Sequence, residues 1–281
     1  MQSKIKSLGL NRKIIAGLSI IVVLTLIAIL GPFLSSYSIS ETDLMHIKSS
    51  PSDNHILGTD EVGRDVLARL IYGGRVSLGV GISAMAMQVS IGVLLGSLAG
   101  YLGGFVDRLI SGIIDTIMCF PFFVAALFAA SISGAGTANI VIICGLLMWP
   151  SVARVVRGEI LSVKERNYIM GARAMGLSKS EILFRYILPN VAHAIVVAAT
   201  LAIANGILTE ASLSFLGLGV NPPTPSWGNM LSAAQNLSAL KSRWWLWMPP
   251  AMMIGITTFG FHILGEGLRE RWSPKDRGGS S

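Results

Sequence analysis

The chain has 281 residues, of which 52% are hydrophobic and only 13% are charged. Because soluble globular domains carry about 25% charged residues, this composition excludes an ordinary soluble protein. Only helices or closed barrels satisfy backbone polar groups in lipid, and the long apolar runs of this chain predict an all-α integral membrane protein. The net charge of +7 then has to be explained by where the basic residues lie.

Apolar segments long enough to cross a bilayer as helices recur along the whole chain. They cover residues 14–34, 76–100, 109–132, 138–155, 191–215 and 248–264. The first is longer than the core of a typical signal peptide, so we expect an uncleaved membrane helix. We therefore predict six transmembrane helices. The division is a tail at 1–13, a first helix with an extracytoplasmic segment at 14–75, a transmembrane core at 76–264, and a tail at 265–281.

The distribution of basic residues predicts the orientation in the membrane. With a cytoplasmic N-terminus, segments 1–13, 101–108, 154–190 and 265–281 face the cytoplasm and hold 16 of the 22 Lys and Arg residues. Basic residues concentrate on the cytoplasmic side of membrane proteins, so both termini are expected there. The same asymmetry explains the net charge, and we expect no nucleic-acid partner.

The second and third apolar segments carry features of helix packing. Before the second, the latter half of residues 57–78 predicts an amphipathic interfacial helix leading into the membrane. Within it, Gly92, Gly96 and Gly100 recur every fourth residue, which predicts a face against which another helix packs closely. In the third segment, Pro121 predicts a bend or an end of the helix.

Two carboxylates lie inside predicted membrane helices, Asp115 in the third and Glu210 in the fifth. A charge at the bilayer centre costs about 2.5–3.5 kcal/mol, so each needs a partner, a cavity or the bundle interior. One interpretation places them along a translocation pathway. The other makes them structural groups that bond to neighbouring helices, and the sequence leaves both open.

Residues 164–190, which we call the elbow, form a basic segment between the fourth and fifth apolar segments. Gly176 is suited to end a short first helix, since glycine adopts the left-handed conformation without penalty. Ser178 and Glu181 have the spacing of a capping box at the start of a second helix, which we expect Pro189 to end. A folded, charged elbow between membrane helices predicts a surface for a cytoplasmic partner.

The segment 217–231 is rich in Gly and Pro and cannot be a regular helix throughout. We expect it to cover the mouth of the helix bundle on the extracytoplasmic side. Trp227 fits the aromatic belt of a membrane interface and is a candidate for docking a soluble extracytoplasmic protein.

Motifs for catalysis are absent from the sequence. There is no Gly-Lys dipeptide, and therefore no Walker A loop for ATP, and no HExxH or Gly-x-Ser-x-Gly pattern. The His and Cys residues lack metal-ligand spacing. We expect no catalytic residue, no metal site and no cofactor bound by this chain.

Four blocks, 57–81, 115–121, 171–190 and 210–231, resemble the permease subunit of a bacterial ABC importer in the dipeptide/oligopeptide/nickel transport family. The resemblance is to the second, C-type, permease of the pair. It implies a type I ABC importer permease fold in the bacterial cytoplasmic (inner) membrane. It also implies four kinds of partner: a homologous second permease, two cytoplasmic ABC ATPases that bind ATP and Mg, an extracytoplasmic substrate-binding protein, and membrane lipid.

In this family the elbow is the coupling helix, inserted into a groove of the ATPase. The resemblance carries that role to the elbow positions Gly171, Ala172, Arg173, Ala174, Gly176, Leu177, Ser178, Leu188 and Pro189. Two positions depart from the family pattern. Gly171 stands where Glu or Gln is common, which puts one polar contact with the ATPase in question, and His262 stands where Asn is usual.

Alternative functions remain open. Dipeptides or oligopeptides are the first expectation for the substrate, and nickel or a metal chelate is the alternative. A proton-coupled secondary transporter would use Asp115 and Glu210 as proton carriers, although the coupling elbow fits an ABC subunit better. A sensor or scaffold protein would use the elbow only to bind a partner, and a transport assay separates these functions.

Overall fold

The computed structural model describes residues 11–34 and 37–272, and the described chain is built from helices without a β-strand. Five helices are long and apolar enough to cross a membrane. They are α2 (Arg12–Leu34), α3 (Val66–Leu102), α6 (Thr137–Val163), α9 (Leu188–Phe215) and α12 (Trp244–Trp272). A bent pair, α4 (Gly104–Cys119) and α5 (Phe122–Ser133), supplies a sixth span if it is counted as one. The predicted all-helical membrane fold is confirmed.

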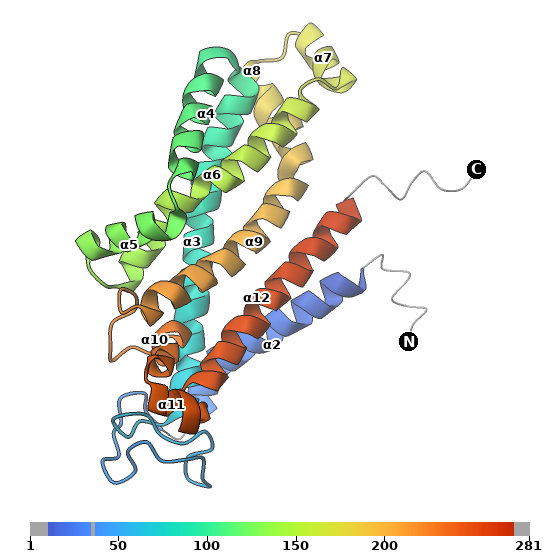
Figure 1. Ribbon diagram of the computed structural model, residues 1–281. Coiled ribbons are helices and arrows are strands. Elements are labelled where there is room, and N and C mark those ends of the chain that lie inside the picture. The colour runs from blue at the N-terminus through green and yellow to red at the C-terminus, as the bar shows by residue number, and fades with distance from the viewer. Residues whose placement is uncertain (1–10, 35–36, 273–281) are drawn as a thin grey trace, which may run out of the picture.

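The helices form an elongated bundle around α3 (Figure 1). Helix α3 packs against α6 and α9, while α12 lies between α2 and α9. The short helices α7 (Asn167–Ala174) and α8 (Lys179–Glu181) lie at one end of the bundle. The loop after α2 lies at the opposite end with α10 (Trp227–Leu231) and α11 (Leu237–Ser242). The N-terminal end of α2 and the C-terminal end of α12 point away from that loop.

Pro121 breaks the third predicted span, as expected. Helices α4 and α5 meet at 86°. Phe120, which precedes the proline, has φ −80° and ψ 138°, the extended conformation that a following proline ring favours. Pro121 is the N-cap of α5, where its missing N–H removes no intrahelical hydrogen bond.

The helix predicted at the membrane interface is continuous with the second span. Helix α3 begins at Val66 and runs without a break to Leu102. Asp65 caps it, accepting a hydrogen bond of 2.7 Å from the Ala68 N–H. The pair Gly73 and Gly74 lies within the helix, and residues 226–227 pack where their side chains would lie.

Pro189 does not end the second elbow helix, which corrects the expectation. Helix α8 continues through a π-helical turn, η1 (Ile182–Ile187), directly into α9. The Leu188 N–H donates to the carbonyl of Leu183, five residues earlier. Pro189 therefore lies in the first turn of α9, where proline is tolerated, and the wider turn before it absorbs the change of register.

The glycine row on α3 is a packing seam, as predicted. A Cβ atom at Gly92 would lie 2.7 Å from the Cβ of Val152, and one at Gly96 would lie 2.6 Å from the Ala153 carbonyl oxygen. Helix α6 therefore approaches α3 closely enough that a methyl group at either position does not fit.

We expect Gly96→Val to lower the free energy of unfolding by about 3 kcal/mol, because the new side chain meets backbone that cannot move aside. The midpoint of thermal unfolding in detergent measures this effect. Gly79→Val is the matched control on the same helix, since nothing lies within 4 Å of a Cβ at Gly79. Equal midpoints for the two variants would contradict the seam.

Candidate functional site

The turn between the elbow helices is a complete Schellman motif. Gly176 has φ +79°, the left-handed conformation predicted for it. Its N–H donates to the Arg173 carbonyl at 3.0 Å, and the Leu177 N–H donates to the Ala172 carbonyl at 3.3 Å. These two bonds satisfy carbonyls that the end of α7 leaves free, so the direction of the chain after α7 is fixed by local bonds.

Ser178 caps the next helix, as predicted, and α8 begins at Lys179. The Ser178 hydroxyl accepts a hydrogen bond of 3.2 Å from the Glu181 N–H. The reciprocal bond of a capping box, from the Glu181 side chain, is not formed among the described residues. The Glu181 carboxylate instead lies 3.5 Å from the Arg185 guanidinium.

One face of the elbow is locked to the membrane helices. Ile169 and Ala172 of α7 and Ile182 and Ile187 of the next helix are all buried. They form one apolar cluster with side chains of α6 and α9, among them Ile160. Helix α7 follows the end of α6, and α8 is continuous with α9, so a displacement of the elbow has to move both helices.

The opposite face of the elbow is exposed. Of the predicted coupling residues, Gly171, Arg173, Ala174, Gly176, Ser178 and Pro189 are exposed, Leu177 and Leu188 are half-buried, and Ala172 is only 1% exposed. The prediction missed four large apolar side chains that share this exposure: Tyr168, Met170, Met175 and Phe184. Tyr168 and Met170 lie in α7, Met175 is its C-cap and Phe184 lies in η1. Their signal in the sequence is that they are large apolar residues in a segment predicted to face the cytoplasm. Ala172 packs the elbow against its own chain and cannot contact a partner directly.

Asp115 on α4 forms an ion pair with Arg154 on α6, at 2.8 Å. The two side chains are 67% and 52% exposed, although both helices belong to the membrane-spanning set. An exposed ion pair is costly in hydrocarbon, and Arg154 begins the segment 154–190 that is predicted to face the cytoplasm, so this pair adjoins water or another subunit.

Glu210 on α9 is fully buried, with 0% exposure. Its two carboxyl oxygens accept hydrogen bonds from the hydroxyls of Ser77 (2.8 Å) and Ser214 (2.7 Å). Each serine oxygen in turn accepts a backbone N–H, Ser77 from Trp227 and Ser214 from Val220, both at 3.1 Å. This Glu210 network ties α3 and α9 to the segment 217–231. Its burial favours the structural interpretation of this carboxyl over a pathway role.

Trp227 is not on the surface. It is 1% exposed, and its indole N–H donates to the Leu70 carbonyl at 3.0 Å. Its side chain therefore cannot dock a soluble protein, and that expectation is corrected. The aromatic-belt pattern misleads here because the Gly-Pro-rich segment folds back and inserts the indole between α3 and α2, against Gly74.

His262 is exposed on α12, and the described residues give no reason for it at a position where the family usually has Asn. Across residues 11–34 and 37–272, no group of three or more His, Cys, Asp and Glu side chains could hold a metal ion.

The family models identify the chain in two parts. Residues 92–275 match the model for the binding-protein-dependent transport system inner membrane component, and residues 6–51 match the N-terminal transmembrane domain of oligopeptide transport permease C. The first match covers the elbow, Glu210, Ser214 and segment 217–231, whereas Ser77 of the Glu210 network lies before it.

Curated relatives align over nearly the whole chain. The oligopeptide transport system permease OppC of Escherichia coli is 40% identical, covering 95% of this chain and 88% of that protein. OppC of Bacillus subtilis is 38% identical, covering 95% and 87%. The dipeptide transport system permease DppC of Alkalihalophilus pseudofirmus is 39% identical, covering 96% and 88%.

A solved structure shares the fold. The inward-facing MetNI methionine ABC transporter matches with a TM-score of 0.60 and 18% identity, covering 73% of this chain and 97% of that chain. The fold is that of a type I ABC importer permease, and the family matches give the assignment its sequence support. The chain belongs to the family of binding-protein-dependent transport system inner membrane components.

Proposed function

We propose that this chain is the second permease subunit of an ATP-driven importer for dipeptides or oligopeptides. The permease C model and the relatives named for oligopeptides and dipeptides support both the subunit and the substrate class. They favour peptides over nickel or a metal chelate. A homologous permease supplies the other half of the pathway, and an extracytoplasmic binding protein delivers the substrate.

The geometry of the elbow carries the proposal. Its outward face combines exposed Met170, Met175 and Phe184 with basic Arg173, while its inward face is buried against α6 and α9. Two cytoplasmic ATPases bind and hydrolyse ATP with Mg, and this chain holds no cofactor. When the ATPases close, each coupling helix moves with its ATPase, and the motion passes to the membrane helices. The cavity alternates between outward and inward access.

The orientation follows from this assignment. The elbow and both chain termini face the cytoplasm of a bacterium, as the excess of basic residues on those segments supports. The loop after α2 and segment 217–231 face outward across the inner membrane. The binding protein docks on that outer side, at residues other than the buried Trp227.

We assign the Asp115–Arg154 pair to the translocation pathway and Glu210 to the structure around it.

Asp115→Asn is expected to reduce peptide uptake several-fold while changing the free energy of unfolding by less than about 1 kcal/mol, because exposed ion pairs contribute little to folding. Asp107→Asn is the matched control on the same helix. Asp107 forms a half-buried pair with Arg157, including a bond of 2.8 Å, and its loss should lower stability by about 1–3 kcal/mol. Unchanged uptake by the Asp115 variant would remove this residue from the pathway.

The deciding experiment is ATPase activity of the co-purified complex in nanodiscs, with its binding protein, across peptides and nickel chelates. We expect stimulation by one class of peptide. Stimulation by nickel chelates alone would transfer the assignment to metal import. Solute movement by the chain alone, without ATP, would establish a secondary transporter instead, and binding without any transport would leave a scaffold.

A further inference from the structure

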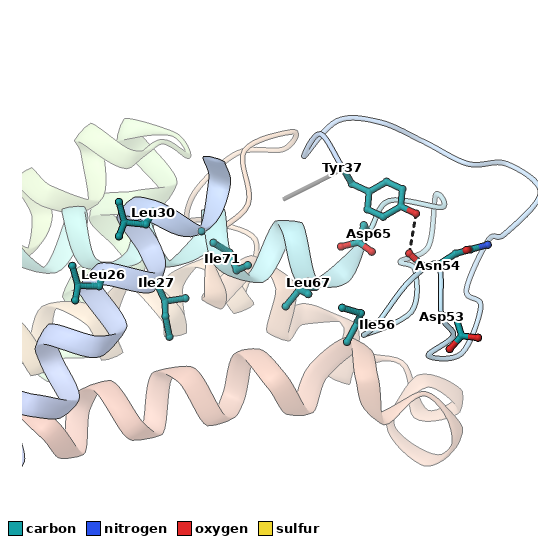
Figure 2. Close-up of a pocket in the computed structure, with 11 residues that line it drawn as sticks. Leu26, Ile27, Leu30, Tyr37, Asp53, Asn54, Ile56, Asp65, Leu67 and Ile71 are labelled. Atoms are coloured by element: carbon teal, nitrogen blue, oxygen red, sulfur yellow. Dashed lines mark hydrogen bonds between the residues drawn. The ribbon is translucent and has the colours of Figure 1, made fainter. Parts of the chain in front are cut away.

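A cavity of 690 Å³ separates α2 from the start of α3 and from the loop that joins them (Figure 2). It lies between the part of the chain that matches the N-terminal domain model, residues 6–51, and the helix that leads into the permease core. The described side chains of these two parts leave space between them, and the chemistry of the residues that line this space indicates which ligand it can hold.

One half of the cavity is apolar. Leu26, Ile27 and Leu30 line it from α2, and Leu67 and Ile71 line it from α3. The three α2 side chains are 41–51% exposed, on a helix that has the length and composition of a membrane span. The medium around this half is therefore bilayer hydrocarbon, which makes an acyl chain the natural occupant.

The loop lines the rest of the cavity with one apolar side chain, Ile56, and with four polar residues. Tyr37, Asp53, Asn54 and Asp65 line it, and no Lys or Arg is among the described lining residues. Asp65 is occupied by the cap of α3 and by its bond to the ring of His55, and the Tyr37 hydroxyl donates to the Asn54 carbonyl at 2.8 Å (Figure 2).

Asp53 is the acidic group left at the polar end. It is exposed, and its carboxylate takes part in none of the hydrogen bonds and ion pairs found among the described residues. A carboxylate at the edge of a membrane-facing cavity attracts a cationic headgroup and repels one that carries only a phosphate charge.

We propose that this cavity binds an aminophospholipid, with an acyl chain between α2 and α3 and its ammonium group beside Asp53. The apolar wall, the polar end and the acidic charge together match an amphiphile with a cationic tip. The lipid fills the space between the N-terminal helix and the core. Its placement in the outer leaflet rests on the proposed orientation, whereas the binding itself does not.

The test is native mass spectrometry of the full complex after exchange into nanodiscs with equal amounts of phosphatidylethanolamine and phosphatidylglycerol. Wild type should retain phosphatidylethanolamine in preference to phosphatidylglycerol. Ile27→Trp fills the apolar half, and retention should fall about tenfold, which corresponds to about 1.4 kcal/mol of binding free energy. The Asp53→Asn complex should still retain lipid, but without a preference for phosphatidylethanolamine over phosphatidylglycerol.

Matched controls separate the cavity from the rest of the surface. Ile29 is equally apolar and exposed on α2 but does not line the cavity, so Ile29→Trp should retain lipid as wild type does. Glu61→Gln removes an acidic charge elsewhere in the same loop and should keep the preference. Equal retention of both lipids by wild type, or equal loss in the Ile27 and Ile29 variants, would overturn the proposal. Loss of peptide-stimulated ATPase activity without any change in lipid retention would count against the proposed function alone.

Discussion

Gly176→Val is expected to abolish transport-coupled ATP hydrolysis while leaving the subunit inserted in the membrane. The left-handed conformation at φ +79° costs an ordinary side chain about 1–2 kcal/mol, and a β-branched one more. Beyond Gly176 and its two chain neighbours, no atom of the described residues lies within 4 Å of a Cβ at this position, so the effect comes from the backbone and not from a collision. A relaxed turn loses both bonds of the Schellman motif, and the exposed face of α7 no longer keeps its direction. Peptide-stimulated ATPase activity of the reconstituted complex measures the result.

Two further variants isolate the cause. Asn tolerates the left-handed conformation better than Val does, so Gly176→Asn should retain a substantial part of the coupled activity. Gly158→Val places the same side chain at an exposed helical position of α6 with nothing within 4 Å, and coupling should be unaffected. Normal activity of the Gly176→Val complex would refute the role of the turn.

Local chemistry made the elbow predictable. The glycine C′ position and the serine N-cap act through backbone groups within a few residues, so a single sequence is enough to place them. The same holds for the break at Pro121, which needs only the proline ring and the residue before it. The glycine seam on α3 was predictable because its period of four residues is a property of one helix, although its partner α6 was not identified.

Long-range contacts were not predictable in the same way. The N–H group of Trp227 meets the Ser77 hydroxyl across 150 positions of sequence, and no periodicity reports such a bond. Residue type alone therefore predicts Trp227 at the surface, whereas the fold buries it. The prediction that Pro189 ends the elbow helix is wrong for a related reason. The rule for proline assumes an α-helical register, whereas the turn before Pro189 is π-helical. Arg154, the ion-pair partner of Asp115, likewise lies on another helix, so the pair cannot be predicted from the sequence around Asp115.

Glu210→Ala should produce the largest loss of stability among these variants. Its carboxyl group orients both serine hydroxyls as donors, and this leaves their oxygen lone pairs free to accept the backbone N–H groups of Trp227 and Val220. Alanine leaves two buried hydroxyls without an acceptor and opens a space between α3 and α9. We expect the free energy of unfolding to fall by about 3–5 kcal/mol, from two lost buried hydrogen bonds and the cavity. Thermal unfolding of the complex in detergent measures this change.

Protease sensitivity distinguishes this network from general destabilisation. If Glu210 holds segment 217–231 through the two serines, cleavage within that segment should rise in Glu210→Ala well below the unfolding midpoint. Thr209→Ala is the control, a neighbouring buried polar residue on α9 whose hydroxyl contacts the sulfur of Met148 at 4.0 Å and takes no part in the Glu210 network. A double-mutant cycle with Ser214→Ala should show strong coupling to Glu210, since the two side chains share one bond. Additive effects of the two substitutions would show that the carboxyl group acts independently of Ser214, and would contradict the role of this serine in holding the segment.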